Sequence, residues 1–129
     1  MTTIINANTS AGLTQTADTS GIVKLQSNGV TTNAIAWVKF VGATGAISAS
    51  YNVSSITRVT TGQYTVTFAS ALADANYTYA VNMFGLAGAN GYFTGTGVLP
   101  TTTAFGMYTI TSGIAYADPT AVVVTFFGN

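Results

Sequence analysis

Apolar and polar residues alternate with a period of two along much of this chain after residue 21, a pattern typical of β-strands with one buried face. The clearest case is Gln63–Ala69, in which large apolar side chains occupy every second position. Gly, Asn, Asp and Ser clusters separate the alternating runs, as turns do. We therefore predict about eight strands, at Ile22–Gln26, Ile35–Val41, Tyr51–Val59, Gln63–Ala69, Tyr77–Phe84, Tyr92–Gly97, Ala104–Thr111 and Ala121–Phe127.

Two of these strands lead to a specific packing prediction. Their apolar faces are Tyr64, Val66 and Phe68 in the first, and Tyr77, Tyr79 and Val81 in the second. We expect both sets to point into the core, from adjacent antiparallel strands.

Turn signals predict how the chain reverses. Val59-Thr60-Thr61-Gly62 is expected to close a hairpin, because glycine tolerates the positive φ that such a turn requires. In Tyr51–Val59 the alternation changes face, so we expect a bulge or bend at Ser54-Ser55 where a strand crosses between sheet edges. The predicted fold class is all-β: an antiparallel β-sandwich or barrel-like domain with an extended N-terminal arm.

The domain organisation follows from the same pattern. Residues 1–21 are rich in Thr, Asn and Ser and weakly patterned, which predicts an extended arm, and residues 22–129 form a single β-domain. The arm carries three apolar anchors, Ile4, Ile5 and Leu13, which cannot form a core of their own. We expect them to bind a partner surface. A frayed terminus is the alternative.

Charge is unusually scarce. Only 5% of the 129 residues are charged, with three basic and three acidic side chains and a formal net charge of zero. Ordinary soluble domains carry roughly 25% charged residues, so an isolated monomer of this chain would be poorly solvated. We therefore expect a homo-oligomer. Its interface is predicted to use apolar residues that alternation cannot place in one core, namely Ile35, Trp37, Val123 and Phe127.

The residue types present argue against an enzyme. The chain has no His, Cys or Glu, and its Asp residues (Asp18, Asp74 and Asp118) lie in turn-like contexts. A serine nucleophile would have only Lys24 or Lys39 as a base, in no S-x-x-K arrangement. We expect no catalytic residues, no cofactor and no metal site.

Nucleic acid and membranes are also poor candidates as partners. Three cations balanced by three anions cannot form the basic stripe that phosphate binding requires. No run approaches the roughly 18 apolar residues of a membrane span, and the first residues lack the features of a signal peptide. A host glycan remains an alternative partner through Trp37, although an aromatic residue on an apolar strand is more often core or interface.

Several blocks of the chain resemble a β-rich module of tailed-bacteriophage virion surface proteins, of the tail-fibre and capsid-decoration type. The blocks are Ala36-Trp37-Val38-Lys39-Phe40, Ser50-Tyr51-Asn52-Val53-Ser54-Ser55-Ile56-Thr57, Gly62-Gln63-Tyr64-Thr65-Val66-Thr67-Phe68 and Ala73-Asp74-Ala75-Asn76-Tyr77. The leader from Gly12 to Gly29 is similar to stretches in phage fibre proteins.

This resemblance implies a non-enzymatic virion structural protein, made in the bacterial host cytoplasm and located on the particle surface. Fibre versions usually sit on long shafts, whereas here the leader begins within a dozen residues of Met1. We therefore expect a capsid decoration (cement) protein that binds the major capsid protein or other virion proteins. A short tail-fibre or tail-tip receptor-binding protein is the alternative. Resemblance to both kinds implies a homotrimer.

Overall fold

The computed structural model describes residues 26–27, 30–85, 92–94, 100–111 and 115–128. Within these ranges the chain is all-β and contains no helix, which confirms the predicted fold class at that level. The strands are β1 (Gln26–Ser27), β2 (Val30–Thr31), β3 (Ala34–Phe40), β4 (Ile47–Tyr51), β5 (Val53–Thr60), β6 (Gln63–Phe68), β7 (Thr78–Phe84), β8 (Tyr92–Thr94), β9 (Ala104–Ile110) and β10 (Ala121–Phe127).

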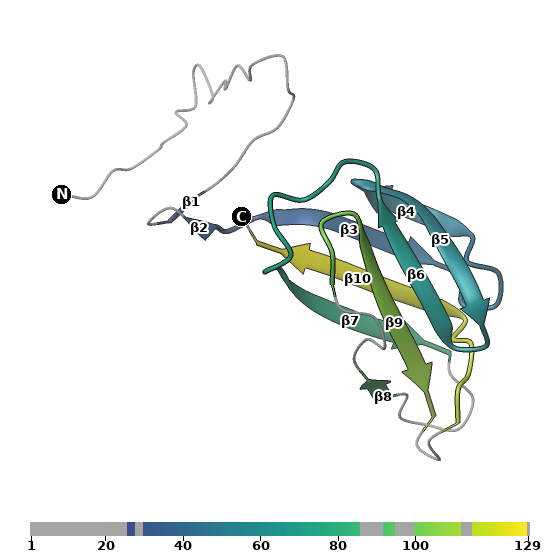
Figure 1. Cartoon of the computed structure of the whole chain (residues 1–129). Coiled ribbons are helices and arrows are strands. Elements are labelled where there is room, and N and C mark those ends of the chain that lie inside the picture. Colours follow the sequence, from purple (N-terminus) through teal and green to yellow (C-terminus); the bar gives the residue numbers. More distant parts are fainter. Residues whose placement is uncertain (1–25, 28–29, 86–91, 95–99, 112–114, 129) are drawn as a thin grey trace, which may run out of the picture.

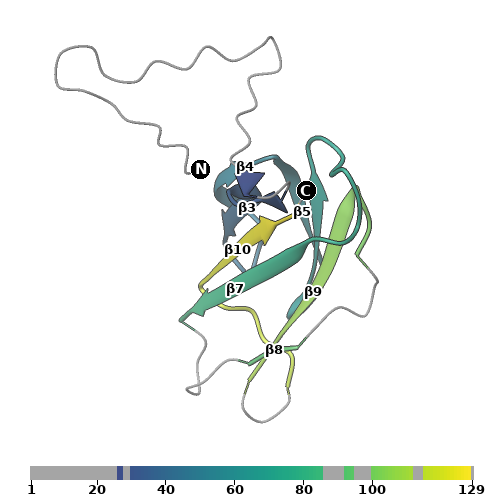
Figure 2. The same cartoon turned by 90° about the vertical axis from the view of Figure 1, so that its left-hand side faces the viewer.

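Two antiparallel sheets form the body of the molecule. One has the strand order β4-β3-β10-β7 and the other β5-β6-β9-β8, while β1 and β2 form a separate two-stranded sheet. The two sheets lie face to face in a sandwich-like arrangement (Figures 1 and 2), and β1 and β2 lie to one side of them (Figure 1). Strands that are neighbours in the sequence are therefore often distributed between different sheets.

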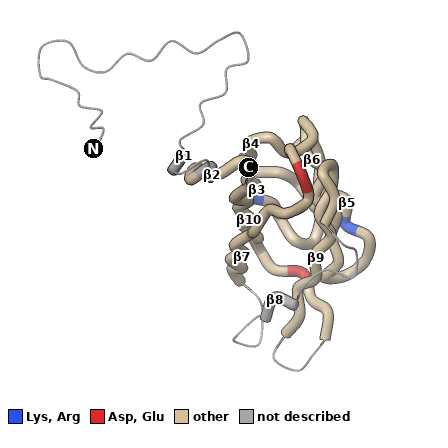
Figure 3. The backbone as a smooth tube through the Cα atoms, turned by 60° about the vertical axis from the view of Figure 1, so that its left-hand side comes forward, with Lys and Arg blue, Asp and Glu red and all other residues tan. Residues whose placement is uncertain are grey.

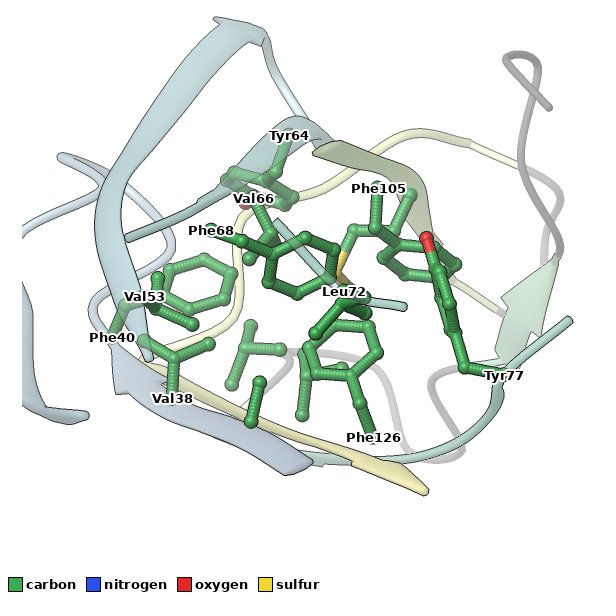
Figure 4. Close-up of a cluster of buried hydrophobic side chains, with 14 residues drawn as sticks. Val38, Phe40, Val53, Tyr64, Val66, Phe68, Leu72, Tyr77, Phe105 and Phe126 are labelled. Atoms are coloured by element: carbon green, nitrogen blue, oxygen red, sulfur yellow. The ribbon is translucent and has the colours of Figure 1, made fainter. Parts of the chain in front are cut away.

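The core lies between the sheets and consists largely of interlocking aromatic rings. Phe68 of β6 meets Phe126 of β10 edge to face, with ring centroids 5.0 Å apart, and meets Tyr77 at 5.8 Å. Phe40 of β3 packs against Tyr64 of β6 at 5.1 Å. Figure 4 shows these side chains converging from both sheets. Such tilted aromatic pairs add to the free energy gained from burying apolar area.

The alternation predicts the buried faces correctly but not the strand neighbours. Tyr64, Val66, Phe68 and Tyr77 are buried, and Tyr79 and Val81 pack against the same core. However, β6 pairs with β5 and β9, whereas β7 pairs with β10 in the other sheet. The prediction of adjacent antiparallel strands is therefore wrong: the two apolar faces meet across the sandwich.

The predicted strand Tyr51–Val59 is two strands in two sheets. β4 ends at Tyr51 and β5 begins at Val53, so the chain crosses between sheets at Asn52, whose φ is 53°. Asn is one of the few residues that adopt this left-handed conformation readily. Its side-chain Oδ1 accepts a hydrogen bond from the Ser70 amide at 2.8 Å. The register also shifts between Val53 and Ser55, so a bulge does occur near Ser54-Ser55, but the crossing itself comes earlier.

The predicted hairpin is confirmed. β5 ends at Thr60 and β6 begins at Gln63, and Gly62 in the turn has a φ of 66°. A Cβ added at Gly62 would lie 2.5 Å from the carbonyl oxygen of Thr109. Gly62 is therefore required both by the backbone conformation and by the close approach of β9.

Other predicted boundaries hold within a residue or two where the structure describes the chain. Ile35–Val41 corresponds to β3, and Ala121–Phe127 matches β10. Of the predicted strand Ile22–Gln26 only Gln26 is described, and it begins β1; of Tyr92–Gly97 only β8 is described. The arm, residues 1–21, lies outside the described residues.

Candidate functional site

The outer face of the β4-β3-β10-β7 sheet exposes several large apolar side chains among the described residues. The residues facing the core on β3 and β10 are fully buried, so the residues that alternate with them face outward. On this face three large apolar side chains remain 37–55% exposed: Tyr51, Phe84 and Phe127. Two further apolar residues on this face, Trp37 and Val123, are half-buried. We call this surface the apolar face.

Cross-strand pairing aligns the residues of the apolar face into rows. In one row Tyr51 of β4 lies opposite Trp37 of β3, which lies opposite Thr125 of β10 and then Ala80 of β7. Directly opposite residues in antiparallel sheets have Cβ atoms about 5 Å apart. The row therefore places an indole beside a phenol on a surface that solvent reaches.

The next row contains the single charge of the apolar face within the described ranges. Ala49 lies opposite Lys39, which lies opposite Val123 and then Asn82. The described charged residues are Lys39, Arg58, Asp74 and Asp118, and Figure 3 shows how sparsely they are distributed. Burying this face against a partner would thus desolvate one cation and otherwise apolar or neutral side chains, which keeps the desolvation cost low.

The outer face of the opposite sheet has a different character. Most of its exposed or half-buried positions on β5 and β6 are small and polar, including Ser55 and Thr57 on β5 and Thr65 and Thr67 on β6. Its apolar exceptions are Val59 of β5 and the ring pair of Tyr108 and Tyr116. The polar part of this face on β5 and β6 is well hydrated and offers little apolar area to bury. The asymmetry between the two faces makes the apolar face the better candidate for binding.

The structure places the sequence-predicted interface residues as follows. Trp37, Val123 and Phe127 belong to strands of the apolar face, as an interface role requires, whereas Ile35 packs against the core. The arm anchors Ile4, Ile5 and Leu13 lie outside the described residues. The sequence pattern did not single out Tyr51 or Phe84 as interface residues. Phe84 follows the inward-facing Met83, however, and this alternation is a usable signal for an outward side chain.

The main cluster of ionisable groups joins the β5–β6 hairpin to the segment before β10. Asp118 accepts hydrogen bonds from Arg58 Nη2 at 2.6 Å, from Arg58 Nε at 3.1 Å, from the Tyr64 hydroxyl at 2.7 Å and from the Gly62 amide at 2.8 Å. Arg58 Nη2 also donates to Thr61 Oγ1 at 2.9 Å. We call this set the Asp118 clamp.

The electrostatics of the clamp keep its groups in their ordinary protonation states at neutral pH. Hydrogen bonds from Arg58 are the largest cause that lowers the pKa of Asp118, to about 2. Burial, followed by the hydrogen bond to Asp118, raises the pKa of the Tyr64 hydroxyl. The carboxylate is therefore charged and saturated with donors, and the phenol stays protonated. The hydrogen bonds of the clamp hold the β5–β6 hairpin against the segment before β10.

The predicted turn roles of the three Asp residues have different outcomes. Asp74 Oδ1 accepts a hydrogen bond from the Asn76 amide at 2.7 Å, which confirms the predicted turn role. Asp118 precedes Pro119 as a turn residue would, but its contacts with β5 and β6 show a larger structural role than the turn explains. Asp18 lies outside the described residues.

Within the described ranges no three acidic, His or Cys side chains gather in a way that could hold a metal ion. The same ranges include no helix long and apolar enough to cross a membrane.

Comparisons of the chain with protein-family models, with curated proteins and with solved structures found no match.

Proposed function

We propose that this chain is a non-enzymatic virion structural protein of a tailed bacteriophage, and that it acts as a capsid decoration (cement) protein binding the particle surface as an oligomer. The single observation that supports attachment is the apolar face, a sheet surface with exposed aromatic residues and one charge. The virion location rests on the resemblance of the Tyr51–Thr57 block and its neighbours to phage surface proteins.

The apolar face suits binding to a protein surface. Its large exposed side chains are aromatic, and aromatic residues are enriched where protein interfaces gain most of their binding energy. The face stands on two long central strands, β3 and β10, that pair along most of their length. A rigid sheet loses little conformational entropy on binding, which favours permanent attachment to a shell.

The N-terminal arm is the second part of this proposal. An extended chain of about twenty residues reaches tens of ångströms, at roughly 3.3 Å per residue, which is enough to cross a seam between shell subunits. We propose that Ile4, Ile5 and Leu13 are its anchors on the particle or on a neighbouring copy.

The test is reconstitution with purified particles of the phage that encodes the chain. The protein is incubated separately with undecorated capsids and with tails, and the bound fraction is measured after sedimentation. Saturable binding to capsids supports the decoration role, and binding to tails alone supports the fibre alternative. No binding to either would contradict a virion role.

Variants separate the two parts of the proposal. Trp37→Ser should weaken binding through the apolar face, while Thr57→Ser, on the other sheet, serves as the matched control. Deleting residues 1–20 should leave the β-domain folded, as judged by circular dichroism, but weaken attachment. If the truncated protein still reaches full occupancy, the arm has no docking role.

One observation favours a second function, binding of a host glycan by a tail-fibre or tail-tip protein. Trp37 and Tyr51 are cross-strand neighbours on the solvent side of the sheet, and Tyr51 is 46% exposed. Sugar rings pack on such aromatic surfaces because their C–H faces are apolar. Binding on a glycan array that disappears with Trp37→Ala, and persists with Phe84→Ala, would support this function over the decoration role.

A further inference from the structure

We infer that β7 is a self-association edge, at which two copies of this chain pair their β7 strands antiparallel about a two-fold axis. β7 is the last strand of the β4-β3-β10-β7 sheet, so one of its sides carries no neighbouring strand among the described residues. The inference does not depend on the virion role.

The four edge strands of the two sheets differ in how well they are protected against pairing. β5 carries two register shifts and the charged Arg58, and β8 has three residues. β4 has five residues, pairs with β3 through a register shift and ends at the Asn52 corner. Bulges, charges and short length are the usual features that prevent edge-to-edge association.

β7 has none of these protective features. It has seven residues, Thr-Tyr-Ala-Val-Asn-Met-Phe, without charge, Pro or Gly, and it pairs with β10 at all seven positions in one continuous register. A regular, uncharged edge of this length is a template for another strand. Its partner β10 is also free of charge, so no repulsion between like charges opposes the approach of two copies.

The occupant we assign is a second β7, because the strand is complementary to itself. When two copies are centred on Val81, Tyr79 lies opposite Met83 and Thr78 lies opposite Phe84 of the other copy. Aromatic rings pair favourably with the methionine sulfur and with β-branched side chains across strands. Ala80 lies opposite Asn82, where a small side chain leaves room for the amide.

Pairing in this register would also cover surface that the single sandwich leaves open. Tyr79, Val81 and Met83 pack against the core but stay only half-buried at the sheet edge, and Phe84 is 55% exposed. In the dimer the two β4-β3-β10-β7 sheets become one continuous sheet, and the two apolar faces join. The result is a larger, two-fold symmetric binding surface.

In the proposed dimer, residue 80 of each copy lies opposite residue 82 of the other copy, so the same pair of positions meets twice. The test uses this symmetry. The full-length double variant Ala80→Lys/Asn82→Lys places Lys opposite Lys at both contacts, and Ala80→Glu/Asn82→Glu places Glu opposite Glu. Both positions are exposed and point away from the core. We expect each variant alone to dissociate, with a dissociation constant raised about tenfold or more relative to the parent.

Mixing the two variants supplies the decisive measurement. The Lys and Glu copies should form a heterodimer, seen by native mass spectrometry, because each contact then pairs opposite charges. Recovery of the dimer also shows that both variants are folded. The matched control is Ser55→Lys/Thr57→Lys, which adds the same charges at two exposed positions of edge strand β5 and should leave association unchanged.

Three results would overturn the inference. The first is a parent protein that sediments as a monomer at micromolar concentration, and the second is charge variants that associate as tightly as the parent. The third is a closed trimer, the state implied by resemblance to phage surface proteins, because a two-fold edge contact cannot build it. None of these three results bears on binding to particles, which the reconstitution experiment tests. Either proposal can therefore be refuted without the other.

Discussion

Removing the charge of Asp118 tests whether the clamp between the β5–β6 hairpin and the segment before β10 stabilises the fold. The Asp118 side chain is 16% exposed and accepts hydrogen bonds from Arg58, Gly62 and Tyr64. In the unfolded chain these donors are replaced by water. The change we propose is Asp118→Asn, which keeps the shape of the side chain and removes its charge.

The pKa of Asp118 sets the magnitude. It is about 2 in the folded protein, against an ordinary value of 3.8, chiefly because of the hydrogen bonds from Arg58. The gap corresponds to about 2 kcal/mol of free energy of unfolding that depends on the carboxylate being charged. Asp118→Asn should therefore lower the free energy of unfolding at neutral pH by about 2 kcal/mol.

The assay is urea unfolding at a series of pH values, followed by circular dichroism. Because the folded-state pKa of Asp118 is lowered, its stabilisation is fully present above about pH 4 and is lost as the pH falls through 2. The parent should lose about 2 kcal/mol over this window. Asp118→Asn should show a flatter profile, since it has no charge to lose at this position.

Asp74→Asn provides the matched control. Asp74 is involved in a local turn hydrogen bond to the Asn76 amide, which an Asn side chain can also accept. This variant should keep the acid-dependent loss of the parent. The reasoning would be refuted if the parent were equally stable at pH 4 and pH 2, or if Asp118→Asn lost as much stability as the parent over that window.

Two further substitutions test the core and the hairpin. Phe68→Ala should lower the free energy of unfolding by about 3–5 kcal/mol, because it empties the site between Tyr77 and Phe126. Thr67→Ala, on the outer face of β6, should lower it little. Equal losses of stability in urea unfolding would mean that the faces of β6 are assigned wrongly. Gly62→Ala should cost more than about 1 kcal/mol, since its φ of 66° is left-handed and the new Cβ would meet the Thr109 carbonyl. An unchanged thermal midpoint for Gly62→Ala would contradict this turn geometry.

The strand positions and their buried faces could be predicted from the sequence because they depend on local information. Alternation with a period of two decides which residues of β6 and β10 share a face, whatever the partner strand is. The β5–β6 hairpin was equally predictable, since its turn spans a few residues and ends at Gly62. The part of β4 before Tyr51 was not predicted, because its Ser and Ala residues show no alternation of large apolar and polar side chains.

The candidate site was predictable only in part. Trp37, Val123 and Phe127 stood out because their strands have more apolar residues than one core face can hold. The rows of the apolar face depend on which strand pairs with which, as when β3 brings Trp37 between Tyr51 of β4 and Thr125 of β10. These contacts join residues up to 88 positions apart in the chain, counted from 37 to 125.

By itself, then, the sequence determined that this chain forms strands, which side of each strand is apolar, and that few charges exist to solvate the surface. Only the tertiary structure decided that β6 and β7 face each other across the core instead of pairing in one sheet. A strand shows the same alternation of apolar and polar residues in either arrangement, so the alternation cannot distinguish them. It also decided that Asp118 binds Arg58, 60 residues away, and that β7 lies at an edge. Hydrogen bonds between distant strands and the packing of two sheets set these features, and no local pattern encodes them.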